Sequence, residues 1–206
     1  MKTVAVAFGE TLAVLFPIVD PIGNTPAFLA LTARLDAERR HRVISRVVLF
    51  VVIGLSAFAL IGEPLLEFFG ISLEALQIAG GLIVAYTGFR MITASEEFLE
   101  TAATGDVALS PLAVPLLAGP GSMAALLGLE SREADFALSL PGTIAGIVVI
   151  GAIIYVCFRF AERLARSIGP GGLIALNVIM GLIVLAIGAE MVVHGIANHG
   201  ALVKVR

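Results

Sequence analysis

Long apolar stretches separated by short polar connections dominate the hydrophobic pattern of the chain. A transmembrane helix needs about 20 consecutive, mostly apolar residues. The pattern predicts six such helices, at residues 6–32, 44–62, 72–92, 111–129, 138–158 and 173–193. Turn residues at Gly62-Glu63-Pro64 are expected to end the second of them.

The first predicted helix contains an interruption. Residues 16–26, FPIVDPIGNTP, place three prolines, a glycine, Asp20 and Asn24 inside the apolar run. Each proline removes a backbone donor and clashes with the carbonyl four residues earlier, so the helix must kink or open. Irregular backbone at membrane depth persists only where it is buried in protein or lines a cavity. We therefore expect two half-helices around Asp20–Pro26 and a candidate site between them.

The fourth predicted helix carries a similar interruption at residues 115–122, PLLAGPGS. At an offset of 98, Pro17 aligns with Pro115, Gly23 with Gly121 and Asn24 with Ser122. Interrupted helices in matching positions of two halves indicate the binding site of a transporter. Whether residues 111–129 cross the membrane fully or form a half-span stays open.

A second internal repeat supports this division. Residues 75–92 align without gaps to residues 175–192, with eight identities in eighteen positions. The repeats predict a single transmembrane domain, 1–206, made of repeat one at 1–93, a polar cytoplasmic linker at 94–110 and repeat two at 111–206. Three helices per repeat place the second copy upside down. The predicted fold is therefore an all-α integral membrane protein with a 3+3 inverted-topology repeat, in which the first helix of each repeat is broken at Pro and Gly.

Composition agrees with a membrane protein. The chain is 59% hydrophobic and only 14% charged, against roughly 25% charged residues in soluble domains. Its net charge of −3 and the lack of a basic run argue against a nucleic-acid partner. The single cysteine excludes an intrachain disulfide.

Basic residues predict the orientation. Nine of the thirteen fall on one side of the predicted helices, and Lys2, Arg132, Lys204 and Arg206 fall on the other. The nine are Arg34, Arg39, Arg40, Arg42, Arg46, Arg90, Arg159, Arg163 and Arg166. Because cytoplasmic loops carry the excess of Lys and Arg, both termini are expected outside the cytoplasm, in a multi-pass protein of the inner (plasma) membrane.

The two interruptions supply groups for a zwitterionic ligand. Free N–H groups where a helix restarts favour an anion, and carbonyls that end the preceding half-helix coordinate a cation or an ammonium. Asp20 is the candidate ion-coupling residue, because it can receive an ammonium, a sodium ion or a proton. The candidate substrate-binding residues are Asp20, Pro21, Gly23, Asn24, Thr25, Pro26, Gly119, Pro120, Gly121 and Ser122, together with Gln77 and Asn177. The alternative is that proline and glycine only kink packed helices and that Asp20 caps the restart.

Other polar positions have simpler interpretations. Gln77 and Asn177 occupy equivalent repeat positions, and helix packing is the alternative to substrate binding for both. Glycines seven apart in the two repeats, and Gly142-x-x-x-Gly146, are typical of close helix contacts. Arg90 and Glu190 are expected to reach the membrane interfaces, and the histidines to lie apart from any acidic or thiol cluster. No metal-ligand spacing and no nucleophile–base pair is evident, so the sequence predicts neither an enzyme nor a cofactor.

The motifs FPIVDPIGNTPAFLALT at 16–32 and PLAVPLLAGPGSM at 111–123 resemble those of the MarC family of bacterial integral membrane proteins. The resemblance implies a bacterial or archaeal inner-membrane protein of six spans, distantly similar to LysE-type amino acid exporters. Some relatives are described as transporters of small neutral amino acids. The resemblance assigns the functional positions to Asp20, Pro21, Gly23, Asn24 and Pro26, with Gly119, Pro120, Gly121 and Ser122.

These observations predict a secondary transporter of small neutral amino acids, such as alanine or glycine, driven by a proton or sodium gradient through alternating access. Two alternatives stay open: an amino acid or drug exporter of the same build, and a non-transporting membrane partner protein. The expected partners are the amino acid substrate and the lipid bilayer. The glycine-rich outer faces favour a homo-oligomer.

Overall fold

The computed structural model describes residues 4–93, 119–130 and 136–203, in which every secondary-structure element is an α-helix. The helices are α1 (Val4–Val19), α2 (Thr25–Thr32), α3 (Ala37–Phe69), α4 (Leu73–Thr93), α7 (Pro120–Glu130), α8 (Phe136–Arg159) and α9 (Ala161–Val203). The all-α part of the predicted fold is confirmed.

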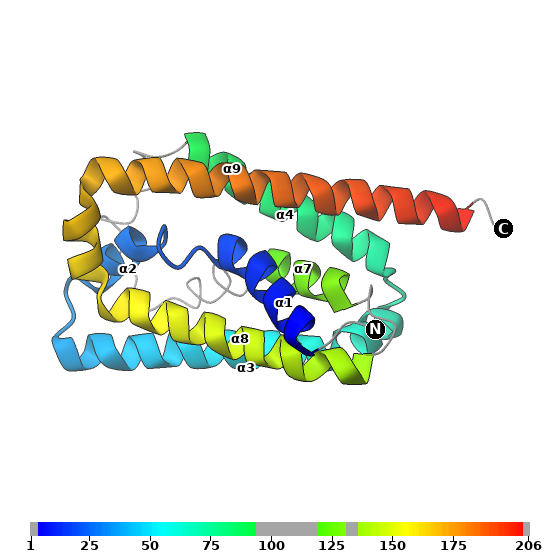
Figure 1. Ribbon diagram of the computed structural model, residues 1–206, viewed down its shortest axis with the longest axis horizontal. Coiled ribbons are helices and arrows are strands. Elements are labelled where there is room, and N and C mark those ends of the chain that lie inside the picture. The colour runs from blue at the N-terminus through cyan, green and yellow to red at the C-terminus, as the bar shows by residue number, and fades with distance from the viewer. Residues whose placement is uncertain (1–3, 94–118, 131–135, 204–206) are drawn as a thin grey trace.

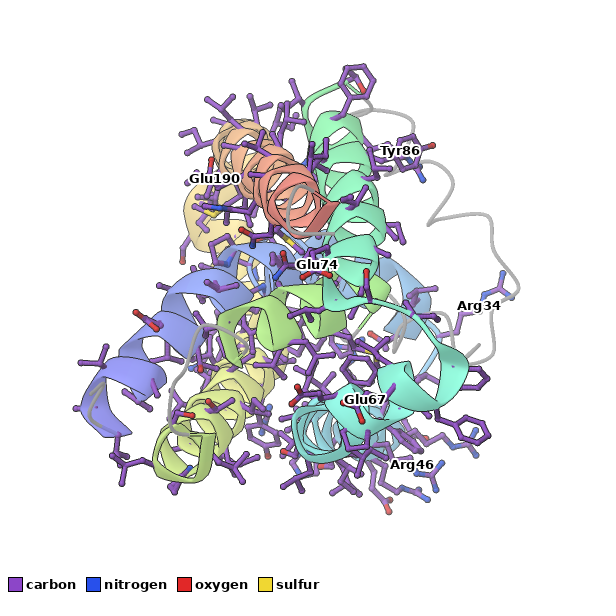
Figure 2. All side chains as sticks on the ribbon, turned by 90° about the vertical axis from the view of Figure 1, so that its right-hand side faces the viewer. Arg34, Arg46, Glu67, Glu74, Tyr86 and Glu190 are labelled. Carbon is purple, nitrogen blue, oxygen red and sulfur yellow. The ribbon has the colours of Figure 1, made fainter. Side chains whose placement is uncertain are left out.

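Four of the described helices are long and apolar enough to cross a membrane. They are α3, α4, α8 and the segment Gly171–Asn198 of α9, and they contain nearly all of the second, third, fifth and sixth predicted spans. Large apolar side chains on them face outward, among them Phe50, Tyr86 and Leu182, and Figure 2 shows Tyr86 pointing away from the bundle. Because a soluble protein rarely exposes so much apolar surface, this belt is typical of an integral membrane protein.

The first predicted span is divided in two, as expected. Helix α1 ends at Val19 and α2 begins at Thr25. The 16 residues of α1 span about 24 Å, less than the roughly 30 Å of a bilayer core. In the fourth predicted span, α7 has 11 residues, and residues 111–118 lie outside the described residues. The number of complete spans and the 3+3 inverted repeat therefore stay predictions.

The helices form two outer pairs around a central layer (Figure 1). Helix α4 packs along α9, and α3 packs along α8. The short helices α1, α2 and α7 lie between these pairs, and each contacts at least one of them. The interrupted helices thus occupy the centre of the bundle, where protein surrounds their irregular backbone.

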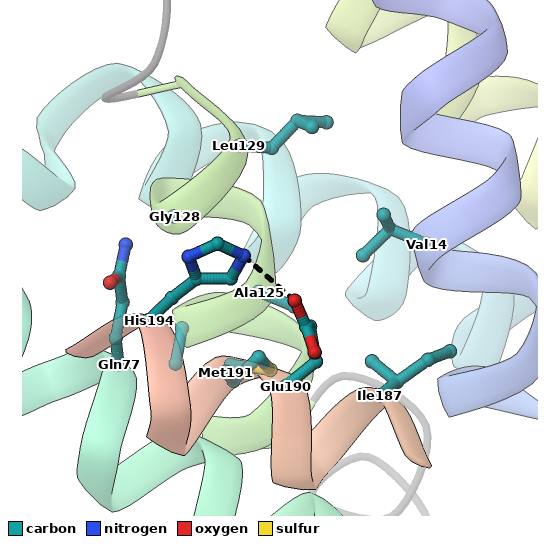
Figure 3. Close-up of a pocket in the computed structure, with 10 residues that line it drawn as sticks. Val14, Gln77, Ala125, Gly128, Leu129, Ile187, Glu190, Met191 and His194 are labelled. Atoms are coloured by element: carbon teal, nitrogen blue, oxygen red, sulfur yellow. Dashed lines mark ion pairs between the residues drawn. The ribbon is translucent and has the colours of Figure 1, made fainter. Parts of the chain in front are cut away.

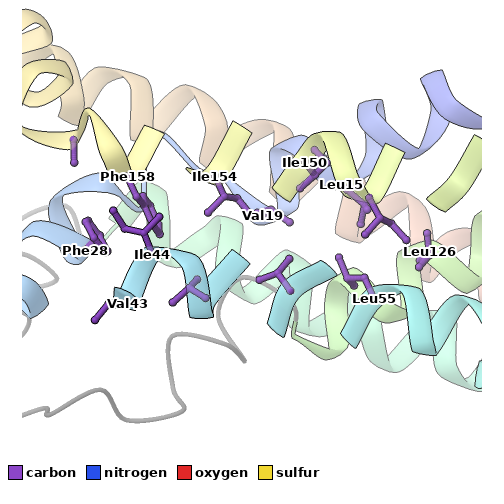
Figure 4. Packing of buried hydrophobic residues seen from close by; sticks show 14 of the residues in the cluster. Leu15, Val19, Phe28, Val43, Ile44, Leu55, Leu126, Ile150, Ile154 and Phe158 are labelled. Atoms are coloured by element: carbon purple, nitrogen blue, oxygen red, sulfur yellow. The ribbon is translucent and has the colours of Figure 1, made fainter. Parts of the chain in front are cut away.

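The hydrophobic core joins the central layer to the α3/α8 pair (Figure 4). Leu15 and Val19 of α1 and Leu126 of α7 are completely buried against aliphatic side chains of α3 and α8. At the α2 end of this core, the rings of Phe28 and Phe158 stack with centroids 4.3 Å apart. Because lipid tails are as apolar as these side chains, such a core holds the helices together mainly through van der Waals packing.

Glycines bring α4 and α9 into close contact. A Cβ added to Gly188 would lie 2.6 Å from the Gly81 carbonyl oxygen, and one added to Gly81 would lie 2.7 Å from the Gly188 carbonyl oxygen. Gly88 and Gly181 make the same reciprocal contact seven residues, or about two turns, further along the two helices. Since no side chain fits between these backbones, the predicted role of the glycines in close packing is confirmed. The α1 backbone contacts Gly142 and Gly146 of α8 in the same way.

One predicted helix end is wrong. Helix α3 continues through Gly62-Glu63-Pro64 and ends at Phe69. A proline removes only one donor from the helix, and the chain stops instead at Gly70, whose φ of 65° forms a left-handed cap. In α9, by contrast, Gly169 has φ 71° and ψ 165° and kinks the helix just before its apolar segment.

A charged contact ties α3 to α9 at the end of the bundle opposite to Val4. Arg40 of α3 forms an ion pair with Glu162 of α9 and also donates to the carbonyl oxygen of Thr32, at 3.3 Å. The hydrogen bond and charge of Arg40 lower the pKa of Glu162 below its usual value. The contact is therefore ionised at neutral pH and joins segments from the two halves of the chain.

Candidate functional site

Asp20 lies at the break between α1 and α2. Its backbone adopts the left-handed region, with φ 40°, which aspartate tolerates better than most residues. Its carboxylate Oδ1 accepts a hydrogen bond from the Gly23 N–H at 3.0 Å, and the residue is only 5% exposed. A buried carboxylate is thus held at the centre of an otherwise apolar helix pair.

The neighbouring polar side chains satisfy the backbone that the break frees. The Asn24 amide donates from Nδ2 to the carbonyl oxygens of Val19 and Asp20, at 2.9 and 3.0 Å. The Thr25 hydroxyl donates to the Pro21 carbonyl at 3.2 Å. These bonds match the capping alternative in their local geometry. Binding of a substrate or an ion at this break stays a prediction. The predicted role of Pro26 in substrate binding also stays a prediction, because its side chain lies outside the described residues.

The second interruption begins α7. Helix α7 starts at Pro120, a position where the missing proline N–H is not needed. Gly119 accepts from the Met123 N–H at 3.2 Å. A Cβ added to Gly121 would lie 2.5 Å from Cγ2 of Val84 on α4, so this glycine permits close packing. Ser122 is 2% exposed.

The two interruptions belong to helices that touch. Helix α1 contacts α7 directly, and Leu15 shares a core cluster with Leu126. Val19, the residue before Asp20, shares the same cluster with Ile154 and Phe158 of α8. The break is therefore enclosed by elements from both halves of the chain.

A cavity of about 210 Å³ lies beside these helices (Figure 3). It is lined by α1, α4, α7 and α9 through Val14, Gln77, Ala124, Ala125, Gly128, Leu129, Ile187, Glu190, Met191 and His194. Of the sequence-predicted site residues whose side chains the structure describes, only Gln77 lines it. On α7 the cavity lining begins at Ala124, two residues after Ser122.

Gln77 and its repeat counterpart Asn177 have different surroundings. Asn177 donates from Nδ2 to the Met91 carbonyl at 3.0 Å and so links α9 to α4. Gln77 is 5% exposed, and its Oε1 has no hydrogen-bond partner among the described residues. A buried acceptor without a donor costs about 1–3 kcal/mol. The described part of the fold therefore supplies no donor to this oxygen.

Sequence reasoning missed two residues of this cavity. His194 was expected to lie apart from any acidic or thiol cluster, and its contact with a single carboxylate was not predicted: its Nε2 is 2.9 Å from Oε1 of Glu190. Glu190 was expected to reach a membrane interface, and its place in the cavity lining was not predicted. Their i, i+4 spacing on one helix places them on the same face, and this was the available signal. Among the described residues, no group of three His, Cys, Asp or Glu side chains is arranged to hold a metal.

Comparison with known proteins identifies relatives along nearly the whole chain. Residues 5–199 match the family described as MarC family integral membrane protein. A UPF0056 membrane protein of Methanocaldococcus jannaschii is 37% identical over 91% of this chain and 94% of its own length. One from Pyrococcus abyssi is 32% identical over 95% of both chains. The UPF0056 inner membrane protein MarC of Escherichia coli is 30% identical over 92% of this chain and 94% of its own. No solved structure matches the chain.

Proposed function

The chain belongs to the MarC family of integral membrane proteins, and from this premise we propose that it is a secondary transporter of small neutral amino acids. The observation that carries the proposal is Asp20, a carboxylate that is 5% exposed and sits at a helix break in the centre of an apolar bundle. Ionisable groups at such positions mark ion and substrate pathways in membrane proteins.

Substrate binds between the two interrupted helices. The start of α2 offers backbone N–H groups to the carboxylate of an amino acid, and Asp20 accepts the ammonium or the coupling ion. The direct contact between α1 and α7 supports a site shared by both. The small size of the adjacent cavity, about 210 Å³, favours a small substrate, because it has room for roughly seven water molecules.

Alternating access follows from a 3+3 inverted repeat, 1–93 and 111–206. Gly81 meets Gly188 while Gly88 meets Gly181, and at the repeat offset of 100 these two contacts are each other's images. Reciprocal contacts of this kind are expected across a two-fold axis. They support a pair of repeats that rock against each other around a central site.

Transport in this scheme draws on a proton or sodium gradient and needs no other cofactor and no enzymatic step. The basic starts of α3 and α9 and the end of α4 lie at the end of the bundle opposite to Val4 (Figure 1). This separation supports an orientation in which the basic end faces the cytoplasm and both termini lie outside it. The site then works in the inner (plasma) membrane.

Uptake by the purified full chain in liposomes tests the proposal. Labelled alanine, glycine and serine are supplied under an imposed proton gradient, a sodium gradient or neither. We expect at least one of them to accumulate inside when a gradient is present, beyond the level in empty liposomes. Uptake equal to that of empty liposomes for all three amino acids, under both gradients, contradicts the proposal.

A further inference from the structure

Contacts between the two halves of the chain close the side of the break that faces the cytoplasm in the proposed orientation. Helix α2 leads from the break to this end of the bundle and contacts α8 and α9. Phe28 of α2 is 6% exposed and stacks on Phe158 of α8, and Ile44 of α3 is buried in the same cluster (Figure 4). Because closely packed apolar side chains exclude water, this layer separates the break from the basic end.

The opposite side of the break is hollow. The cavity of about 210 Å³ lies there, lined on α1 by Val14, six residues before Asp20, and on α7 from Ala124 onward. The structure is therefore closed toward the basic end and hollowed toward the end that holds Val4. Alternating access requires the closed side to open in turn, so a contact at the basic end must break and re-form.

One charged contact at the basic end joins the two halves. Arg40 of α3 forms an ion pair with Glu162 of α9 through Nη1 and donates from Nη2 to the carbonyl oxygen of Thr32. Thr32 is the last residue of α2 and lies one turn beyond Phe28, so Arg40 connects three helices next to the apolar layer. The other ion pairs between described residues join positions three or four apart in the sequence. Among the described residues, this ion pair alone therefore crosses between the halves.

Hinge positions flank the segments that Arg40 holds together. Glu162 lies on the short start of α9, which is interrupted at Gly169 by φ 71° and ψ 165°. A Cβ added to Gly169 meets nothing within 4 Å, so this glycine serves the backbone conformation rather than packing. On the other side, α2 is attached to α1 at the break between Val19 and Thr25. Hinges form at such element-terminal positions.

The charged contact is specific to this end of the bundle. At repeat offsets of 98–100, Arg40 corresponds to residues 138–140, Leu-Ser-Leu, so repeat two has no basic counterpart. The ion pair is therefore not a feature that both repeats share. The Arg40 side chain is 24% exposed, and its buried Nε has no partner among the described residues. Opening returns this group to water, which keeps the closed contact reversible.

We propose that the Arg40–Glu162 ion pair is a cytoplasmic gate contact, which keeps the α2 side of the break closed and breaks when the site opens to the cytoplasm. The inference rests on the transport function proposed above and adds the contact that controls access to its site from one side. Breaking the ion pair shifts the population toward the state that is open to the cytoplasm, because only the closed state contains it.

Thiol labelling from the cytoplasmic side tests this gate contact. The full chain carries Cys157→Ser and Asn24→Cys, and a membrane-impermeant maleimide is applied to inside-out membrane vesicles. Glu162→Arg brings two positive charges together, and we expect it to raise the labelling rate at least about fivefold, as for the loss of a half-exposed ion pair. Adding Arg40→Glu exchanges the two charges and should return the rate toward that of the parent protein.

A matched control and the opposite face separate gating from general loosening of the fold. Glu38→Arg breaks the ion pair between Glu38 and Arg42, which lies within α3, and should leave the rate unchanged. In right-side-out vesicles, Glu162→Arg should not raise the rate. A purely structural ion pair, once broken, would lower the melting temperature and change labelling from both faces or from neither.

The gate contact is overturned if Glu162→Arg labels at the parent rate from the cytoplasmic face, if its rate rises equally from both faces, or if the charge exchange does not slow it. If Glu162→Arg does not fold, Arg40→Glu, which brings two negative charges together, is judged by the first two criteria. These results leave the transport function standing when liposome uptake is positive. Conversely, one-sided labelling in a protein without uptake of any amino acid retains the gate contact and rejects transport.

Discussion

Replacing Asp20 by asparagine is expected to abolish accumulation of substrate while leaving the fold intact. With one coupling ion, a tenfold ion gradient supports about tenfold accumulation of substrate. An asparagine at position 20 can neither bind a cation electrostatically nor exchange a proton. Accumulation should therefore fall to the external concentration, measured as gradient-driven uptake of labelled alanine into liposomes.

Asp20→Asn removes the charge of the side chain but can keep its local hydrogen bond and backbone conformation. The asparagine side-chain oxygen can accept the Gly23 N–H as Asp20 does, and asparagine also tolerates the positive φ of this position. Asp36→Asn is the matched control, because Asp36 accepts from the Arg39 N–H at 2.7 Å in the exposed cap of α3. It should transport like wild type. Full proton- or sodium-dependent accumulation by Asp20→Asn would remove the coupling role of Asp20.

Gly188→Ala is expected to give the largest loss of stability. The added methyl group would lie 2.6 Å from the Gly81 carbonyl oxygen and would also meet the backbone of Ala85. Because backbone cannot move aside as a flexible side chain does, α4 and α9 must separate. Overpacking of this kind costs about 1–3 kcal/mol, and each kcal/mol lowers the melting temperature by roughly 2–4 °C in a chain of this size. Thermal unfolding of the protein in detergent measures the change.

Gly54→Ala provides the control for this effect. Gly54 lies within α3, and a Cβ added there meets nothing within 4 Å. Alanine should stabilise this helix by about 0.5–1 kcal/mol, because glycine loses more conformational entropy on folding. Equal melting temperatures for Gly188→Ala and Gly54→Ala would mean that α4 and α9 do not pack as closely as described.

Local sequence patterns predicted the elements well. Apolar runs located α3, α4, α8 and the apolar segment of α9. Proline and glycine located the break, with α1 ending at Val19 and α2 beginning at Thr25. Both features are local: the length of an apolar run and the loss of backbone donors at proline can be read from residues that are adjacent in the sequence. The helix end predicted at Pro64 was wrong because the hydrogen bond lost at one proline costs less than the helix gains by continuing to its cap at Gly70.

Contacts between distant segments could not be predicted from local patterns. Gln77 and Asn177 are equivalent in the repeat, yet only Asn177 finds a backbone carbonyl on the facing helix. Gln77 instead faces α7, where a Cβ added to Gly128 would lie 2.9 Å from its Nε2. The difference comes from α7, an element from the other half of the chain. Likewise, the cavity and its Glu190–His194 pair depend on how α7 and α9 pack together.

Transport requires an aqueous solute path that reaches the break between α1 and α2. Thiol labelling measures this access, because the chain has one cysteine, Cys157, which Cys157→Ser removes. In that background, Asn24→Cys and Ser122→Cys are treated in turn with a membrane-impermeant thiol reagent, and a cysteine at exposed Glu67 serves as the positive control. We predict that Asn24→Cys or Ser122→Cys reacts and that alanine slows the reaction. Failure of both to react, while the control labels fully, would contradict the account and favour a membrane protein that does not transport.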